Sequence, residues 1–133
     1  MIVRNCFLVL FLLCLALVLY GIFRPEPPPE LFSQSDKVGH VLAFLALGVT
    51  GRASFPVLSP WLFWPPLLVA APALEWLQHA IRPLRIFSVE DAAANLAGAV
   101  LAMGVAAAWG LLGGRYLQQR RSGLATALRG PPP

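Results

Sequence analysis

Nine polar or ionisable side chains lie within or beside the apolar stretches of this chain, and their types suit proton transfer or anion binding. Histidine and carboxylates act as general acids and bases, while arginine and lysine bind phosphate or carboxylate groups. An ionisable group at membrane depth costs roughly 2.5 kcal/mol or more, so a set that converges there is a candidate functional site. The nine residues are Asp36, Lys37, His40, Glu75, Gln78, Arg85, Ser88, Asp91 and Asn95.

The spacing of these residues places three pairs of them on helical stripes. Within each pair the residues are three or four positions apart and share one helical face: Asp36 with His40, Glu75 with Gln78, and Asp91 with Asn95. The first and last pairs open an apolar stretch, and the middle pair closes one. If the stretches cross a membrane in turn, all three pairs lie at the same face, where we expect the stripes to meet. Gly98, one turn beyond Asn95, would let a neighbouring helix pack close to that amide.

The composition is that of a membrane protein. Of the 133 residues, 58% are hydrophobic and 12% are charged, and the mean hydropathy is +0.71. A soluble domain carries about a quarter charged residues. We therefore predict one all-α domain over residues 1–114, an integral membrane bundle of four transmembrane helices. The sequence pI of 9.8 does not indicate a nucleic-acid partner, because no basic face is interleaved with aromatic residues.

The four expected spans are 6–23, 38–50, 61–81 and 91–112. No small-residue cleavage site follows the first, so we expect it to be retained and not removed as a signal peptide. The second covers only about 20 Å and must include its polar start, be supported by neighbours or run on past Arg52. In the third, a kink near Pro72 is expected. The basic segment 115–133 is predicted to be a disordered cytoplasmic tail.

The distribution of basic residues predicts the orientation in the membrane. With four crossings both termini lie on one side, together with Arg4, Arg52, Arg115, Arg120, Arg121 and Arg129. The opposite side holds Arg24, Lys37, Arg82 and Arg85 and every acidic residue. The positive-inside rule then places both termini in the cytoplasm and the polar stripes at the outer face of the membrane.

Several of the nine residues also have plain structural explanations. Asp91 could serve only to cap the last helix, and Lys37 could be an interfacial anchor. Arg82 and Arg85 could bind lipid phosphate as ordinary juxtamembrane cations. His40, Glu75 and Asn95 are different, because they fall about one turn or more inside their apolar segments. A carboxylate at the position of Glu75 needs a partner or a proton.

The order of these residues resembles a known family pattern. The string DKVGHVLAF at 36–44 resembles the DKxxHFxxF opening of VanZ-like membrane proteins, and the later run resembles the family's ExxQ, R, S, D, N and G positions. That run consists of Glu75, Gln78, Arg85, Ser88, Asp91, Asn95 and Gly98. The resemblance covers 36–98, about half of the chain. Val41 stands where an aromatic residue is common, and Ala102 where a second glycine is often seen.

The resemblance implies a small polytopic protein of the bacterial cell envelope, from a family associated with resistance to the glycopeptide teicoplanin. Three functions stay open: binding of an anionic lipid-linked or glycopeptide-type ligand at the outer face, an enzyme acting on a lipid-linked envelope substrate, and a polar lock that joins helices. Membrane lipids are the other expected partners. No metal or other cofactor is expected, because His40, Glu75, His79 and Asp91 match no recognised ligand motif.

Overall fold

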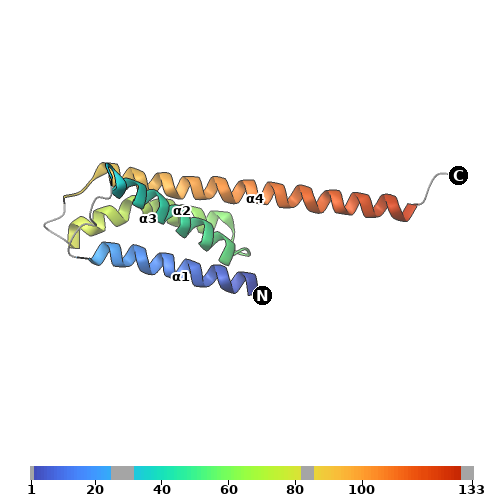
Figure 1. Cartoon of the computed structure of the whole chain (residues 1–133), viewed down its shortest axis with the longest axis horizontal. Coiled ribbons are helices and arrows are strands. Elements are labelled where there is room, and N and C mark those ends of the chain that lie inside the picture. The colour runs from blue at the N-terminus through green and yellow to red at the C-terminus, as the bar shows by residue number, and fades with distance from the viewer. Residues whose placement is uncertain (1, 25–31, 82–85, 130–133) are drawn as a thin grey trace.

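The computed structural model describes residues 2–24, 32–81 and 86–129, with side chains described as far as residue 112. Within these residues the chain is all-helical and has no strand, as the sequence predicts. The helices are α1 (Ile2–Phe23), α2 (Ser35–Ser54), α3 (Pro60–Ile81) and α4 (Val89–Arg129). They run alternately up and down, so that the end of α1, the start of α2, the end of α3 and the start of α4 gather at one end of the molecule (Figure 1).

Small residues bring α2 and α4 together. A Cβ atom added at Gly98 of α4 would collide with the backbone oxygen of Val41 in α2 and would lie 2.9 Å from the Cβ of Phe44. Only a residue without a side chain fits this contact, as the position of Gly98 one turn beyond Asn95 predicts. The buried core lies beside it, where α2, α3 and α4 meet, and consists of Phe44, Ala71 and Ala99.

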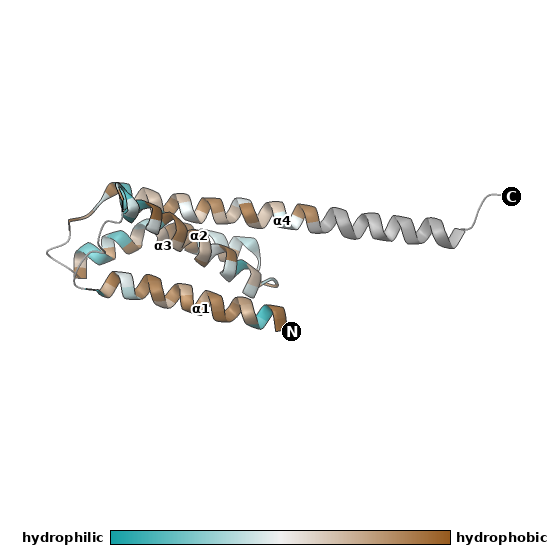
Figure 2. Cartoon of the chain, viewed as in Figure 1, coloured by the Kyte–Doolittle hydropathy of each residue, from teal (hydrophilic) through white to brown (hydrophobic). Residues whose placement is uncertain are grey.

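Two helices in the described part of the chain are long and apolar enough to cross a membrane: α1, with a mean hydropathy of 2.9, and residues 89–112 of α4, with 1.7. Figure 2 shows α1 as an almost continuously hydrophobic helix. It buries only Ile22, so its apolar side chains face outward along most of its length. These two helices and the composition indicate a membrane protein. The polar stripes lie on α2, on α3 and at the start of α4.

The boundaries of α2 explain how the short second stretch is accommodated. The helix begins at Ser35, so Asp36, Lys37 and His40 form its first two turns, and it passes Arg52 before ending at Ser54. Its 20 residues extend over about 30 Å, the thickness of a hydrocarbon core. α3 is continuous from Pro60 to Ile81 across its internal prolines, and the kink near Pro72 stays a prediction.

α4 is longer than the expected span 91–112. It continues as one helix of 41 residues to Arg129, through positions that the sequence predicts to be disordered. Residues 115–129 contain Leu, Ala, Gln and Arg, which have high helix propensity, and no proline interrupts them. A helix of this length extends over about 60 Å, roughly twice the hydrocarbon thickness, so its last turns project from the bundle (Figure 1).

Candidate functional site

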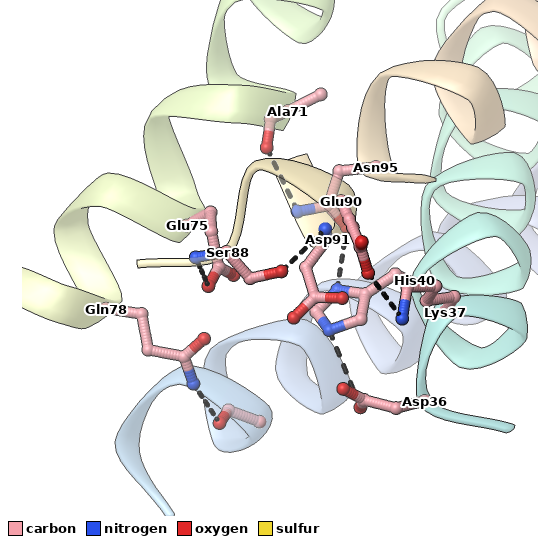
Figure 3. Close-up of polar contacts among 11 residues, drawn as sticks. Asp36, Lys37, His40, Ala71, Glu75, Gln78, Ser88, Glu90, Asp91 and Asn95 are labelled. Atoms are coloured by element: carbon pink, nitrogen blue, oxygen red, sulfur yellow. Dashed lines mark hydrogen bonds and ion pairs between the residues drawn. The ribbon is translucent and has the colours of Figure 1, made fainter. Parts of the chain in front are cut away.

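Asn95 links α4 to both neighbouring helices through its buried amide, which is only 3% exposed. Its Nδ2 donates to the backbone oxygen of Ala71 in α3 at 3.1 Å, and its Oδ1 lies 2.9 Å from Nδ1 of His40 in α2 (Figure 3). A backbone carbonyl can only accept, so the amide nitrogen must face Ala71 and the amide oxygen must face His40. The Nδ1 atom of His40 therefore carries a proton and donates it to Asn95.

The second ring nitrogen of His40 faces a carboxylate on its own helix. Nε2 lies 3.6 Å from Oδ1 of Asp36, one turn earlier in α2. This separation is longer than an ordinary hydrogen bond. Both side chains are partly accessible, at 20% for His40 and 34% for Asp36. With its proton on Nδ1, a neutral His40 ring directs the lone pair of Nε2 toward this side of the cluster.

The start of α4 is capped by Ser88 and Glu75 together. The Oγ atom of Ser88 accepts from the backbone N–H of Asp91 at 3.1 Å, while the N–H of Ser88 donates to Oε1 of Glu75 in α3 at 3.4 Å. Glu75 thus takes the place that a first-turn acid holds in a capping box. Asp91 is not the capping side chain. Its carboxylate, on a residue only 8% exposed, accepts no hydrogen bond from the described residues and lies beside His40 (Figure 3).

Gln78 has a structural task at the end of α1. Its Nε2 donates to the backbone oxygen of Gly21 at 3.0 Å. Carbonyls in the last turn of a helix have no partner within the helix, and a buried one needs a donor from elsewhere. Gln78 is itself 4% exposed, so this contact satisfies its buried amide and joins α3 to α1.

Lys37 is paired at the rim of the cluster with Glu90, a residue that the sequence analysis did not single out. Its Nζ lies 2.8 Å from Oε2 of Glu90, and the two side chains are 35% and 73% exposed. This ion pair joins the first turn of α2 to the first turn of α4. Glu90 could have been identified from the sequence by its position in the first turn of the last helix.

A cavity of about 580 Å³ lies between α1 and the other three helices. Apolar side chains of α1, α2 and α3 form most of its wall, among them Leu17, Val18, Leu42 and Leu74. Its polar wall consists of Tyr20, Arg24, Ser35, Asp36, His40, Glu75, Gln78 and Asn95. These residues belong to the ends of helices that gather at one end of the bundle (Figure 1), so the cavity is polar there and apolar deeper in.

Comparisons of the chain with protein-family models, with curated proteins and with solved structures find no match. The structure brings the predicted site residues together from α2, α3 and the start of α4, with the exception of Arg85 (Figure 3). Arg85, like Arg82, lies outside the described residues. His79 is exposed and is not among the residues lining the cavity.

One group of three side chains has a geometry that could hold a metal ion, and the expectation that no metal is bound stays a prediction. Asp36, His40 and Asp91 each offer one ligand atom, and these atoms all lie within 4.8 Å of one another. This set differs from the one weighed on the sequence, because it takes Asp36 in place of Glu75 and His79. The spacing of these three residues in the sequence could not reveal the group, because they come from α2 and α4, which come together only when the chain folds.

Proposed function

We propose that the chain is a multi-pass protein of the bacterial inner membrane whose cavity binds an anionic lipid-linked or glycopeptide-type ligand from the outer face. In this proposal all four helices cross the membrane, both termini lie in the cytoplasm, and the protein is a VanZ-like member of the cell envelope that contributes to glycopeptide resistance. The observation that carries the proposal is the cavity, whose wall is polar at one end and apolar along the rest.

The two-part wall suits an amphiphile. A polar head group would lie beside His40 and Asp36, and an apolar chain would lie along Leu17 and Leu42. Ligand pockets are generally apolar with a few convergent polar groups that set orientation. A purely soluble ligand would leave the apolar wall without a partner, which favours a lipid-linked molecule.

The exposed surface of α1 supports a bilayer as the surroundings of this cavity. Leu12 is 53% exposed and Leu17 is 69% exposed on a helix that carries one basic residue, Arg4, near its start. Such a surface is unfavourable in water and favourable in hydrocarbon. The ends of α2 and α3 are more polar, and packing against α4 and α1 would shield their buried groups from lipid.

The charged residues at the polar end of the cavity determine how an anionic head group could bind there. Asp36 and Glu75 line this end, and Lys37 at the rim is bonded to Glu90. Arg24 lines the cavity as well, so an anionic head group would bind beside its guanidinium. The sequence offers Arg85 as a second cation for this role, because the planar guanidinium binds phosphate or carboxylate through two parallel hydrogen bonds.

A cavity-filling substitution tests the proposal. Gly39 lines the cavity, and an added Cβ there has no atom within 4 Å, so Gly39→Phe should fold and obstruct the space. Gly104 is equally unobstructed and lies in α4 away from the cavity, which makes Gly104→Phe the matched control. The protein is reconstituted in lipid nanodiscs, and binding of a polyprenyl phosphate, of phosphatidylglycerol and of teicoplanin is measured separately.

We expect wild type and Gly104→Phe to bind at least one of the three probes, and Gly39→Phe to lose that binding. Retained binding in Gly39→Phe would show that the ligand does not enter the cavity. No binding of any probe to the wild-type protein would overturn the proposal.

A second candidate function, a polar lock between helices, is favoured by the hydrogen bonds of Asn95. Through these bonds the Asn95 side chain connects α4 to α2 and to α3. If the cluster has only this role, Gly39→Phe changes no phenotype, and every substitution that abolishes glycopeptide resistance in a host also lowers the amount of folded protein in the membrane.

A further inference from the structure

We propose that Asp36, His40 and Asp91 bind a divalent transition-metal ion at the end of the bundle where α2 and α4 begin. The three ligand atoms come from two helices, and all lie within 4.8 Å of one another. Figure 3 shows the two carboxylates beside the His40 ring. This inference goes beyond the proposed ligand binding and does not depend on it.

The hydrogen bonds of Asn95 prepare His40 as a ligand. Because Asn95 accepts the proton of Nδ1 at 2.9 Å, the lone pair of a neutral ring is on Nε2, the nitrogen that faces Asp36. In metal-binding histidines, the ring nitrogen that does not bind the metal almost always donates its N–H to a neighbouring acceptor. This hydrogen bond sets the tautomer and the orientation of the ring. Asn95 is itself held by Ala71, so α3 supports the ligand geometry from behind.

The distance between His40 and Asp36 also fits a shared ion. Nε2 and Oδ1 are 3.6 Å apart, and two ligands at Zn–N and Zn–O distances of about 2.0–2.2 Å on one tetrahedral ion are separated by about 3.3–3.5 Å. Without an intervening cation or a second ring proton, a nitrogen lone pair and a carboxylate oxygen would face each other unfavourably. A ring proton on Nε2 could bond to only one carboxylate, whereas this group contains two.

The carboxylate of Asp91 is the independent observation that points to a cation. The residue is 8% exposed, and its carboxylate accepts no hydrogen bond from any described residue. The N–H of Ser88, with which a first-turn acid would ordinarily pair, donates to Glu75 instead. A buried carboxylate is retained only when it is paired or binds a metal.

The group contains two carboxylates, Asp36 and Asp91. Among the described residues, Lys37 supplies the nearby ammonium and is bonded to Glu90, while its charge acts on Asp36 and Asp91 from farther away. No lysine or arginine of the described residues forms an ion pair with either carboxylate. A divalent ion would neutralise both. It would also turn the acidic end of the cavity into a place where an anionic head group can bind, a consequence that rests on the proposed function.

The donor set indicates the kind of ion. One imidazole nitrogen and two carboxylate oxygens suit Zn²⁺ or Mn²⁺ better than Mg²⁺ or Ca²⁺, which prefer all-oxygen ligands. Three protein ligands leave a coordination position open, as in zinc sites that bind water or substrate. The Irving–Williams order then predicts that Zn²⁺ binds more tightly than Mn²⁺.

The test is a metal titration of the full chain, purified in detergent with an affinity tag that lacks histidine and stripped with a chelator. Calorimetry with ZnCl₂, MnCl₂ and MgCl₂ should give one Zn²⁺ per chain, weaker binding of Mn²⁺ and no saturable binding of Mg²⁺. Asp91→Asn should weaken Zn²⁺ binding by more than about tenfold, since loss of a residue that binds the ion directly costs more than loss of one that only orients a ligand. The matched control is Glu90→Gln, which removes the neighbouring negative charge and should leave the affinity within about threefold, since that carboxylate pairs with Lys37 and is not a ligand.

Histidine gives a second matched pair, because the chain contains only 2. His40→Ala should abolish Zn²⁺ binding, and His79→Ala should preserve it. X-ray absorption of the Zn²⁺-loaded wild type should report one imidazole per ion. Unfolding curves recorded without metal verify that each variant is folded. If Asp91→Asn does not fold, Asp36→Asn replaces it, because Asp36 is a more exposed ligand.

Three outcomes would overturn the metal site: no Zn²⁺ binding by the wild type, equal loss in Asp91→Asn and Glu90→Gln, or loss on substitution of His79 but not of His40. All three can be observed without any lipid or glycopeptide probe. A failed metal titration therefore leaves the test with Gly39→Phe intact, and a failed ligand test leaves the metal titration intact.

Discussion

His40 and Asn95 are joined by a 2.9 Å hydrogen bond although 55 positions separate them in the chain. The contact places the start of α2 against the start of α4 and orients the imidazole at the same time. Because the other end of the Asn95 amide is held by Ala71 at 3.1 Å, the ring orientation depends on three helices at once. The same contact thus links the stability of the bundle to the chemistry of the cluster.

Replacing Asn95 by Leu should lower the free energy of unfolding in detergent by about 1–3 kcal/mol, because it leaves the Nδ1–H of His40 without its acceptor and removes one donor from the Ala71 carbonyl. Leucine has a similar volume, so lost packing contributes little. The measurement is thermal or denaturant unfolding of the purified protein. Leu96→Ala, at a neighbouring position of α4 that is 39% exposed, should change it by less than about 1 kcal/mol. An Asn95→Leu variant as stable as wild type would mean that the buried hydrogen bonds contribute nothing net.

Adding a methyl group at Gly98 should separate α2 from α4. Gly98→Ala places its Cβ against the backbone oxygen of Val41 and within 2.9 Å of the Cβ of Phe44, and backbone atoms cannot move aside without shifting a helix. We expect a loss of about 1–3 kcal/mol in unfolding free energy. Gly104→Ala in the same helix meets nothing within 4 Å and should be neutral or stabilising by up to about 1 kcal/mol, since alanine is the better helix former. Equal behaviour of the two variants would contradict the close contact at Gly98.

The helical periodicity of the polar residues was sufficient to predict that three stripes share one end of an all-helical bundle. Stripe spacing is a local property, and the alternation of apolar stretches gives its direction. Asp36 with His40 on α2 and Asn95 on α4 therefore meet as expected. The predicted start of the last span was also within two residues of the observed Val89.

The partners within the cluster could not be predicted, because they depend on how the helices rotate and cross. Ser88 and Asp91 resemble an ordinary capping pair in the sequence, yet Glu75 from another helix takes the capping position on the N–H of Ser88. That exchange leaves the Asp91 carboxylate available beside His40. Gln78 lines the cavity and also donates to the last turn of α1, a contact that its spacing on α3 could not indicate.

The orientation in the membrane can be tested with single cysteines in a background that lacks Cys6 and Cys14, both of which are free thiols. Ser33 and Val57 are exposed and belong to the loops at opposite ends of α2. If the termini are cytoplasmic, a membrane-impermeant maleimide added to intact cells should label Ser33→Cys and not Val57→Cys. Permeabilised cells provide the control in which both react. Labelling of Val57→Cys alone in intact cells would reverse the orientation, and labelling of both or of neither would contradict the crossing by α2.

The last prediction concerns Arg85, which the sequence offers as the cation for an anionic ligand. Arg85→Lys should weaken binding of the anionic probe nearly as much as Arg85→Ala, because a lysine ammonium keeps the charge but loses the planar pair of donors that bridges a phosphate or carboxylate. Arg82→Lys is the matched control and should be tolerated, since a juxtamembrane cation that contacts lipid phosphate needs only its charge. The measurement is binding of the probe that the wild type retains in nanodiscs, with folded protein quantified in parallel. If Lys is tolerated equally at both positions, Arg85 supplies only diffuse charge, and the anion must be held by another group, for which Arg24 in the cavity wall and the proposed metal ion at Asp36, His40 and Asp91 are then the candidates.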